Sequence, residues 1–332
     1  KTFSIAFADD SFDESSFARQ VAQHIGASHQ VETCTVDDLR EHLGDILGRL
    51  DEPMADASLL PTFLLCRHAR RQVTVALGGD GADELLAGYD PFRALRYARL
   101  YQRVVSGALH RGIVAAISRL PVSHRYMSLD FKLKRTLRGV GDAPRLWLPL
   151  WMSPLSPDEL TELCQEPIDA EELYSEAITA WDRCSRANDV DRSICFYVDL
   201  YLQDDILTKV DRASMMHSLE VRAPFLDIEL VDFLRTLPAD LKLRGGSGKW
   251  LLKQATRTLL PSGIIQRRKQ GFAVPTGRWF EQGLLPAAAT ASPFWQKQLN
   301  EHQSGKADHR LSLWSQLVLD SFANDTPTGA DA

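Results

Sequence analysis

Apolar residues in the first part of the chain form short continuous runs separated by stretches with helical spacing. Three runs have the length of buried strands, at residues 2–8, 28–33 and 73–77. Apolar spacing predicts helices between them, at residues 13–26, 36–50 and 59–71. Strands that alternate with helices indicate a parallel sheet with crossover helices. The pattern therefore predicts an α/β class for residues 1–92, with helices flanking a parallel sheet.

The pattern changes to helices alone from about residue 93. We interpret residues 93–285 as a mostly helical lobe and residues 286–332 as a C-terminal helix followed by a tail. The polar residues 324–332 are predicted to be disordered. A chain of 332 residues is long for one core, so about two lobes are expected.

Composition narrows the class of protein. The hydrophobic fraction of 44% and the charged fraction of 25% are typical of a globular protein. The net charge of −6 argues against nucleic acid as a partner, and no apolar run is long enough to span a membrane. Five cysteines without a CxxC pair indicate reduced thiols, so we expect a soluble, cytoplasmic protein. The first residue is not Met and already lies in a predicted strand, so we expect a piece of a longer protein.

The stretch 72–89, QVTVALGGDGADELLAGY, carries the first candidate chemistry. A predicted strand ends in a glycine-rich turn that holds Asp80, Asp83 and Glu84 before a helix begins. Ligands bind at this edge of open α/β sheets, and glycines allow close approach of the backbone. Three carboxylates would repel bare phosphate but suit phosphate bound through Mg²⁺. The alternative is an acidic first turn that only stabilises the helix dipole.

Charged residues are interleaved with apolar ones in a second stretch, residues 199–227. Asp205 and Lys209 lie one helical turn apart and could form a simple ion pair worth about 0.3 kcal/mol. The functional interpretation is that Asp204 or Asp205 binds metal while Lys209 or Arg212 holds phosphate. Structural ion pairs in a helical lobe are the alternative.

Two later loops bring further cations. Residues 243–253 form a glycine-rich loop that presents Lys249 at the start of a helix, which suits anion binding, although the Walker pattern is absent. Residues 266–272, QRRKQGF, place Arg267, Arg268 and Lys269 before a glycine. Such a loop could deliver a cation to an anionic centre, but solvated surface charge is the commoner meaning.

In this order, the stretches resemble the synthetase domain of the glutamine-dependent asparagine synthetase B family. The matching segments are Asp51-Glu52-Pro53 with Asp56 and Ser58, LGGDGADELLAGY, DDILTKVDRASM with LEVRAPFLD, GKWLLK, and RRKQGF. They cover most of residues 1–285 with similar spacing. The resemblance implies the N-type ATP pyrophosphatase fold, which is similar to adenine-nucleotide alpha-hydrolases, followed by a helical lobe.

The resemblance also implies a reaction and its residues. ATP and Mg²⁺ convert the side-chain carboxylate of aspartate into an acyl-adenylate, and ammonia from a separate N-terminal glutaminase domain then gives asparagine. By position, Asp80 acts at the adenylate, and Lys269 neutralises charge that develops on phosphorus and on the oxyanion. Residues expected to bind nucleotide are Ile5 (through its backbone), Gly78, Gly79, Asp83 and Lys249, with Asp83 and Asp205 as metal ligands.

Two family features are not found in these residues: the catalytic N-terminal cysteine and the Ser-Gly-Gly-x-Asp-Ser loop that follows the first strand. We expect both upstream in the parent protein, and therefore predict that this fragment alone is inactive. By resemblance the parent is expected to dimerise. Alternatives are a relative that activates another carboxylate, such as a β-lactam or lasso-peptide cyclase or a polysaccharide-cluster amidotransferase, and a non-catalytic remnant.

Overall fold

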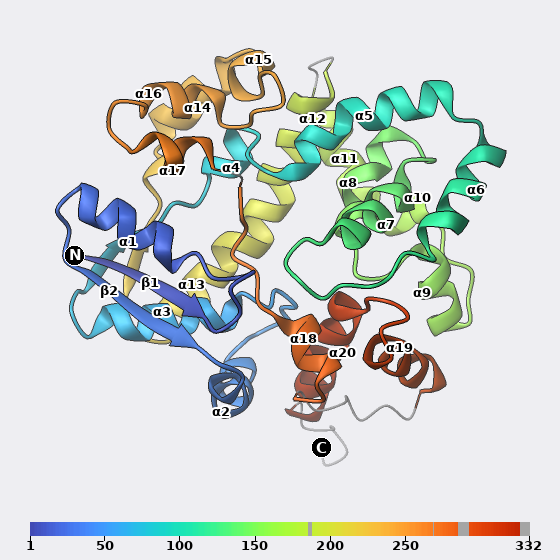
Figure 1. The fold of residues 1–332 in the computed structure, drawn as a ribbon, viewed down its shortest axis with the longest axis horizontal. Coiled ribbons are helices and arrows are strands. Elements are labelled where there is room, and N and C mark those ends of the chain that lie inside the picture. The colour runs from blue at the N-terminus through green and yellow to red at the C-terminus, as the bar shows by residue number, and fades with distance from the viewer. Residues whose placement is uncertain (185–187, 268, 285–291, 326–332) are drawn as a thin grey trace, which may run out of the picture.

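The computed structural model describes residues 1–184, 188–267, 269–284 and 292–325, as drawn in Figure 1. Its first part alternates strands and helices as the apolar pattern predicts. The elements are β1 (Thr2–Phe7), α1 (Ser15–His24), β2 (His29–Cys34), α2 (Val36–Leu47), α3 (Leu59–Arg70) and β3 (Val75–Leu77). Local capping explains one boundary, because Thr35 and Asp38 form a capping box that starts α2.

The strands form two separate parallel pairs. β1 pairs with β2, and β3 pairs with β4 (Glu220–Arg222), a three-residue strand that the sequence pattern does not predict. The prediction that residues 73–77 form a buried strand is wrong for Val75, which is 41% exposed, and for Leu77, which is 73% exposed. The reason is that both side chains line a large cavity, described below, and are not covered by a packed layer.

One small apolar cluster nevertheless joins the two pairs. Cys66 and Ala69 of α3 pack with Leu219, and partly buried residues of both pairs, Phe3 from β1 and Ala76 from β3, pack against them. Helix α3 also contacts β1, β2 and α13, so it lies beneath this part of the molecule. The two strand pairs thus share one helical support without being hydrogen-bonded to each other.

Helices make up most of the remainder of the described chain. In Figure 1, the helices of residues 90–196 gather on the right, away from β1 and β2, whereas those of residues 228–266 lie above α1. A core around the fully buried Trp147 includes Phe92, Phe196 and Tyr197. The helices are α4 (Ala82–Leu85), α5 (Asp90–Val104), α6 (Gly107–Ile117), α7 (Leu129–Gly139), α8 (Pro144–Met152), α9 (Pro157–Cys164), α10 (Ala170–Leu173), α11 (Ser175–Arg183), α12 (Asp189–Phe196), a π-helical stretch (Tyr197–Leu207), α13 (Thr208–Met215), a 3₁₀ turn (Pro224–Leu226), α14 (Ile228–Thr236), α15 (Ala239–Lys242), α16 (Trp250–Ala255) and α17 (Ser262–Gln266).

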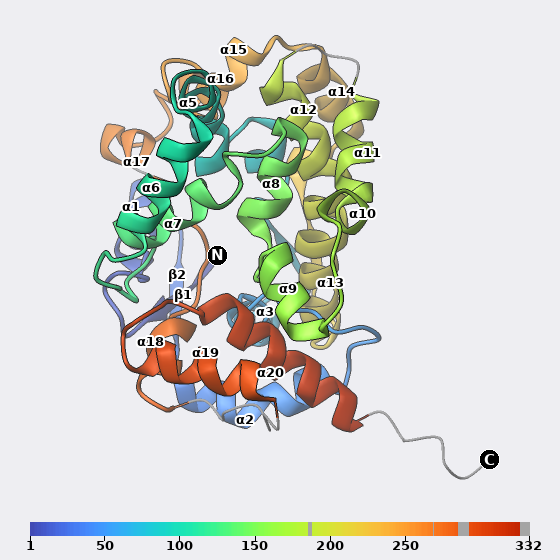
Figure 2. The same ribbon diagram turned by 90° about the vertical axis from the view of Figure 1, so that its right-hand side faces the viewer.

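The last three helices return to the α/β part. They are α18 (Thr276–Glu281), α19 (Pro293–Gln303) and α20 (Arg310–Asp325), and α20 contacts α2 at the base of the molecule in Figure 2. Trp279 of α18 and Trp314 of α20 are buried in the same core as Ile5 and Phe63. This core contains residues from both sides of the boundary predicted at residue 285. The division of the chain into domains stays a prediction.

No helix of the described residues has both the length and the apolar character needed to cross a bilayer. The predicted disordered tail falls mostly outside the described residues.

We predict that replacing Trp314 by alanine destabilises the chain by about 3–5 kcal/mol, because a large side chain is removed from the shared core. Leu319→Ala on the same helix is the matched control; Leu319 is half-exposed, and its loss should change stability by about 0.5 kcal/mol or less. Urea denaturation followed by circular dichroism measures both. Equal effects of the two substitutions would mean that α20 does not anchor this core.

Candidate active site

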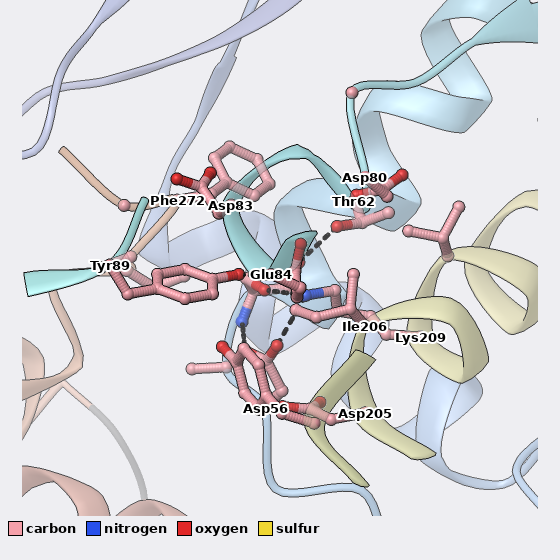
Figure 3. A pocket seen from close by; sticks show the side chains of 18 of the residues that line it. Asp56, Thr62, Asp80, Asp83, Glu84, Tyr89, Asp205, Ile206, Lys209 and Phe272 are labelled. Atoms are coloured by element: carbon pink, nitrogen blue, oxygen red, sulfur yellow. Dashed lines mark hydrogen bonds and ion pairs between the residues drawn. The ribbon is translucent and has the colours of Figure 1, made fainter. Parts of the chain in front are cut away.

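A cavity of about 1630 Å³ lies where the α/β part meets the helical part. Its walls include the turn after β3, the start of α3, the π-helical stretch, α5, α7 and the loop that precedes α18. Six of the eight residues that the family resemblance assigns to the site line it: Gly78, Gly79, Asp80, Asp83, Asp205 and Lys269. The further candidates Glu84, Asp204 and Lys209 line it as well. Figure 3 shows Asp56, Asp80, Asp83, Asp205 and Lys209 gathered around one part of this cavity.

The turn after β3 depends on its glycines. Gly81 has a left-handed backbone with φ of +91°, and a Cβ there would lie 2.3 Å from Leu226 Cδ2. The Gly78 N–H donates to the Arg222 carbonyl at 2.8 Å, which ties the turn to the end of β4. A larger residue at position 81 would therefore clash, and the turn could not carry Asp80 and Asp83 into the cavity wall.

Asp83 is held between two lysines from distant segments. Lys249 Nζ lies 2.9 Å from Asp83 Oδ1, and Lys269 Nζ lies 2.9 Å from Asp83 Oδ2. Burial alone would raise the pKa of Asp83, but the ammonium groups of Lys269 and Lys249 outweigh it and hold that pKa below its ordinary value. Asp83 is therefore ionised, and the two lysine side chains meet at one carboxylate.

A close backbone contact brings the Lys249 loop to this point. The Lys249 N–H donates to the Leu86 carbonyl at 2.8 Å, and Lys249 itself has a left-handed φ of +53°. A Cβ on Gly248 would lie only 2.1 Å from the Ala87 carbonyl oxygen. Only glycine fits at position 248, because the two backbones touch there.

A second charge cluster contains Lys209, which is 5% exposed. Its Nζ lies 2.6 Å from Asp56 Oδ2 and 2.9 Å from Ser58 Oγ. Burial would raise the pKa of Asp56, but Lys209 and the hydrogen bonds from Lys209 and Ser58 keep it below its ordinary value. The sequence suggested Asp205 as the simple partner of Lys209; the ion pair found is with Asp56.

Asp205 lies beside this pair and behaves differently. Burial raises the pKa of Asp205 to about 7, and the neighbouring Asp56 carboxylate adds to the shift. Asp205 therefore keeps its proton up to near-neutral pH and shares a hydrogen bond with Asp56. Burial likewise raises the pKa of Asp80, for which the described residues supply no ion pair.

A buried carboxyl and an aromatic ring complete the wall next to Lys269. Glu84 is 2% exposed, and its Oε1 accepts a hydrogen bond from the Tyr89 hydroxyl, as Figure 3 shows. Burial raises the pKa of Glu84. The Lys269 ammonium lies 5.2 Å from the centre of the Tyr89 ring.

The other two residues assigned by the resemblance do not line the cavity, and neither do the candidate cations Arg212 and Arg267, which pair with Asp51 and Glu14. Ile5 is buried in the core beneath β1, and Lys249 reaches the site through Asp83. Sequence reasoning assigned no role to Tyr89 or Asp56, and it counted Glu84 among three carboxylates suited to Mg²⁺-bound phosphate, whereas the structure buries Glu84 against the Tyr89 hydroxyl. The only signal for Asp56 was its place in the motif with Glu52 and Pro53.

The side chains of the cavity wall are chemically suited to Mg²⁺, because they present carboxylate oxygens and Mg²⁺ prefers oxygen ligands. Asp80 carries no competing ion pair among the described residues, whereas both oxygens of Asp83 already contact lysines. Asp205 would first have to lose its proton. Of these three residues, Asp80 is therefore the one most readily available to a metal ion.

Comparison with known proteins now decides the family. The family model described as asparagine synthase matches residues 1–323. The chain belongs to the asparagine synthase family. The resemblance inferred from the motifs is thus confirmed.

Individual relatives agree with this membership. A Mycobacterium tuberculosis protein, whose name includes the words asparagine synthetase (glutamine-hydrolyzing), is 31% identical over 96% of this chain and 49% of its own length. Asparagine synthetase (glutamine-hydrolyzing) 1 of Bacillus subtilis is 26% identical over 96% of this chain and 51% of its own. A Penicillium rubens protein named amidase chyE is 23% identical over 84% of this chain and 44% of its own. The chain thus spans about half the length of the curated relatives it matches.

Replacing Gly248 by alanine should destabilise this synthase-family chain by about 1–3 kcal/mol, because the added Cβ would overlap the Ala87 carbonyl. Gly263→Ala is the control, since a Cβ at Gly263 meets nothing within 4 Å. Chemical denaturation of both variants tests this. A Gly248 variant as stable as the Gly263 variant would contradict the close docking of the loop.

The raised pKa of Asp205 predicts that the effect of replacing this residue on stability depends on pH. Its folded-state pKa of about 7 lies above the ordinary value of 3.8, so its contribution to stability falls as pH rises between these values and is constant above them. Asp205→Asn should therefore be more stable than the wild type, by a margin that widens from about pH 4 to pH 7.

Thermal melts from pH 4 to pH 9 in buffer with EDTA measure this margin. The exposed neighbour Asp204→Asn is the control and should show no such trend. A margin that does not change with pH would show that Asp205 is ionised throughout.

Proposed function

We propose that this chain is the synthetase part of an amide-forming enzyme that activates a carboxylate with ATP. The carboxylate oxygen attacks the α-phosphorus of ATP, the bond to the β-phosphate breaks, and pyrophosphate leaves. Ammonia then attacks the acyl carbon of the adenylate, the bond to AMP breaks, and the nitrogen loses a proton. By family resemblance, aspartate is the first candidate acceptor and asparagine the product.

The observation that carries the proposal is the meeting of Lys249, Asp83 and Lys269 at the cavity wall. Lys269 would neutralise the negative charge that develops on phosphorus and then on the acyl oxygen, in a partly buried site where a fixed cation is worth most. Gly78 and Gly79 offer backbone close to the nucleotide. Lys249 would hold phosphate, and Asp80 would act at the adenylate.

Binding of the nucleotide follows the same scheme. The Ile5 backbone would contact adenine, and Asp80, Asp83 and, once deprotonated, Asp205 would hold Mg²⁺. When bound, Mg²⁺ would offset charge on the phosphates. The fold we propose is the adenine-nucleotide alpha-hydrolase type, with one further parallel strand and a pyrophosphate-binding loop supplied by sequence upstream of residue 1.

The unpaired edges support that further strand. β1 and β3 each pair on one edge only within the described chain, and the cavity is lined by Thr2 and Phe3 of β1 and by Val75 and Leu77 of β3. A strand between them would pair with the free backbone edges of β1 and β3. We accordingly propose that residues 1–332 alone do not turn over ATP.

At the level of the whole protein, we propose that ammonia comes from an N-terminal glutaminase domain. Dimerisation and a cytoplasmic location stay predictions. The second candidate is a relative that adenylates another carboxylate, which the similarity to the fungal protein named an amidase favours weakly. Against a non-catalytic remnant stands the convergence of Asp83, Lys249 and Lys269.

The test is release of pyrophosphate by the full-length gene product with ATP, Mg²⁺, ammonium and a panel of carboxylic acids that includes aspartate. We expect Lys269→Ala to lower kcat by about 10²–10³-fold, the usual loss when one group that stabilises developing charge is removed. Lys306→Ala, an exposed lysine far from the site, is the control.

Aspartate turnover would support the asparagine synthetase assignment, and turnover of another acid alone would favour the second candidate. Absence of pyrophosphate release with every acid would overturn the enzyme proposal. Efficient turnover by residues 1–332 alone would overturn the proposal that a further strand and loop are needed.

A further inference from the structure

The ammonium group of Lys269 has two neighbours of different kinds. One is the Asp83 carboxylate at 2.9 Å, and the other is the face of the Tyr89 ring, 5.2 Å from its centre. A cation over an aromatic face is attracted by the negative charge above the ring. Lys269 therefore lies between a charged partner and a neutral one.

Asp83 alone does not determine where Lys269 lies. Its carboxylate is shared with Lys249, so two ammonium groups compete for the same charge. Lys269 belongs to the loop between α17 and α18, and its side chain is partly exposed. A second contact is needed to keep the long side chain in one rotamer, because a lysine loses much conformational entropy when it is fixed.

The Tyr89 ring is itself immobilised. It stacks on Tyr197 with ring centres 5.0 Å apart, and it meets the edge of Tyr201 at 5.7 Å. Its hydroxyl donates to the buried Glu84 carboxyl. The ring is thus held by a stacked neighbour and an edge-on neighbour and anchored at its hydroxyl, with Lys269 over the ring.

We propose that Tyr89 is a positioning residue that holds the Lys269 ammonium through its ring face, with Glu84 anchoring the ring. The inference rests on the proposed function, in which Lys269 acts on developing negative charge. A neutral ring orients the ammonium without cancelling its charge, whereas a carboxylate at the same place would neutralise it. The arrangement keeps Lys269 fixed and still cationic toward an incoming phosphate.

The sharpest test varies the charge above the ring without changing its size. Phenylalanine and its mono-, di- and trifluorinated forms are placed at position 89 of the full-length gene product. Pyrophosphate release is then measured with ATP, Mg²⁺ and the acid that the enzyme turns over. Each added fluorine weakens attraction of a cation to the ring face, so log kcat should fall steadily, by about tenfold across the series, while KM for ATP stays within about twofold.

Two further variants separate positioning from packing. Tyr89→Leu removes the aromatic face and should lower kcat about as much as the trifluorinated ring. Phe92→Leu is the matched control, because Phe92 packs on the same Tyr197 ring and does not line the cavity. It should lower the melting temperature and leave kcat unchanged.

The outcomes distinguish this inference from the proposed function. A flat fluorination series in an enzyme that needs Lys269 overturns the positioning role and leaves the proposed function standing. Full activity of Lys269→Ala overturns the role of Lys269 and the inference together. A graded series that disappears in the Lys269→Ala background supports the contact between ring and ammonium.

Discussion

The contact of the Asp83 carboxylate with the ammonium groups of Lys249 and Lys269 joins three parts of the chain that are far apart in sequence. A buried carboxylate without a partner would take up a proton, so the two lysines are what keep it ionised. In return, the carboxylate gives both cations a common partner. The loop after β3, the glycine-rich loop before α16 and the loop before α18 are therefore mutually dependent.

A second electrostatic arrangement lines the same cavity. The Lys209 ammonium neutralises the charge of the Asp56 carboxylate. Asp205, whose pKa is raised to about 7, is protonated and uncharged below neutral pH. Burial also raises the pKa of Asp80 and of Glu84. Lysine contacts at Asp56 and Asp83, together with burial that disfavours the charged forms of Asp80, Glu84 and Asp205, lower the repulsion that an anionic ligand would meet.

The local sequence predicted the helices of the first part well, most clearly α2, whose buried residues Leu39, Ile46 and Leu47 recur at helical spacing. The site turn was also readable, since glycines and carboxylates followed a strand. β4 was missed because three residues are too few to show alternation. The partner of Lys209 was missed because Asp56 lies 153 positions away and only packing brings the two together.

Backbone strain at the site argues that its geometry is maintained for a reason. Lys249 has a left-handed φ of +53°. This backbone conformation costs about 1 kcal/mol for any residue that carries a Cβ. Glycine at this position would relieve the strain but would remove the ammonium that contacts Asp83. Gly248, one residue earlier, is in turn required by the contact with Ala87. Within this loop, the strained backbone therefore occurs at the residue whose ammonium group contacts the Asp83 carboxylate.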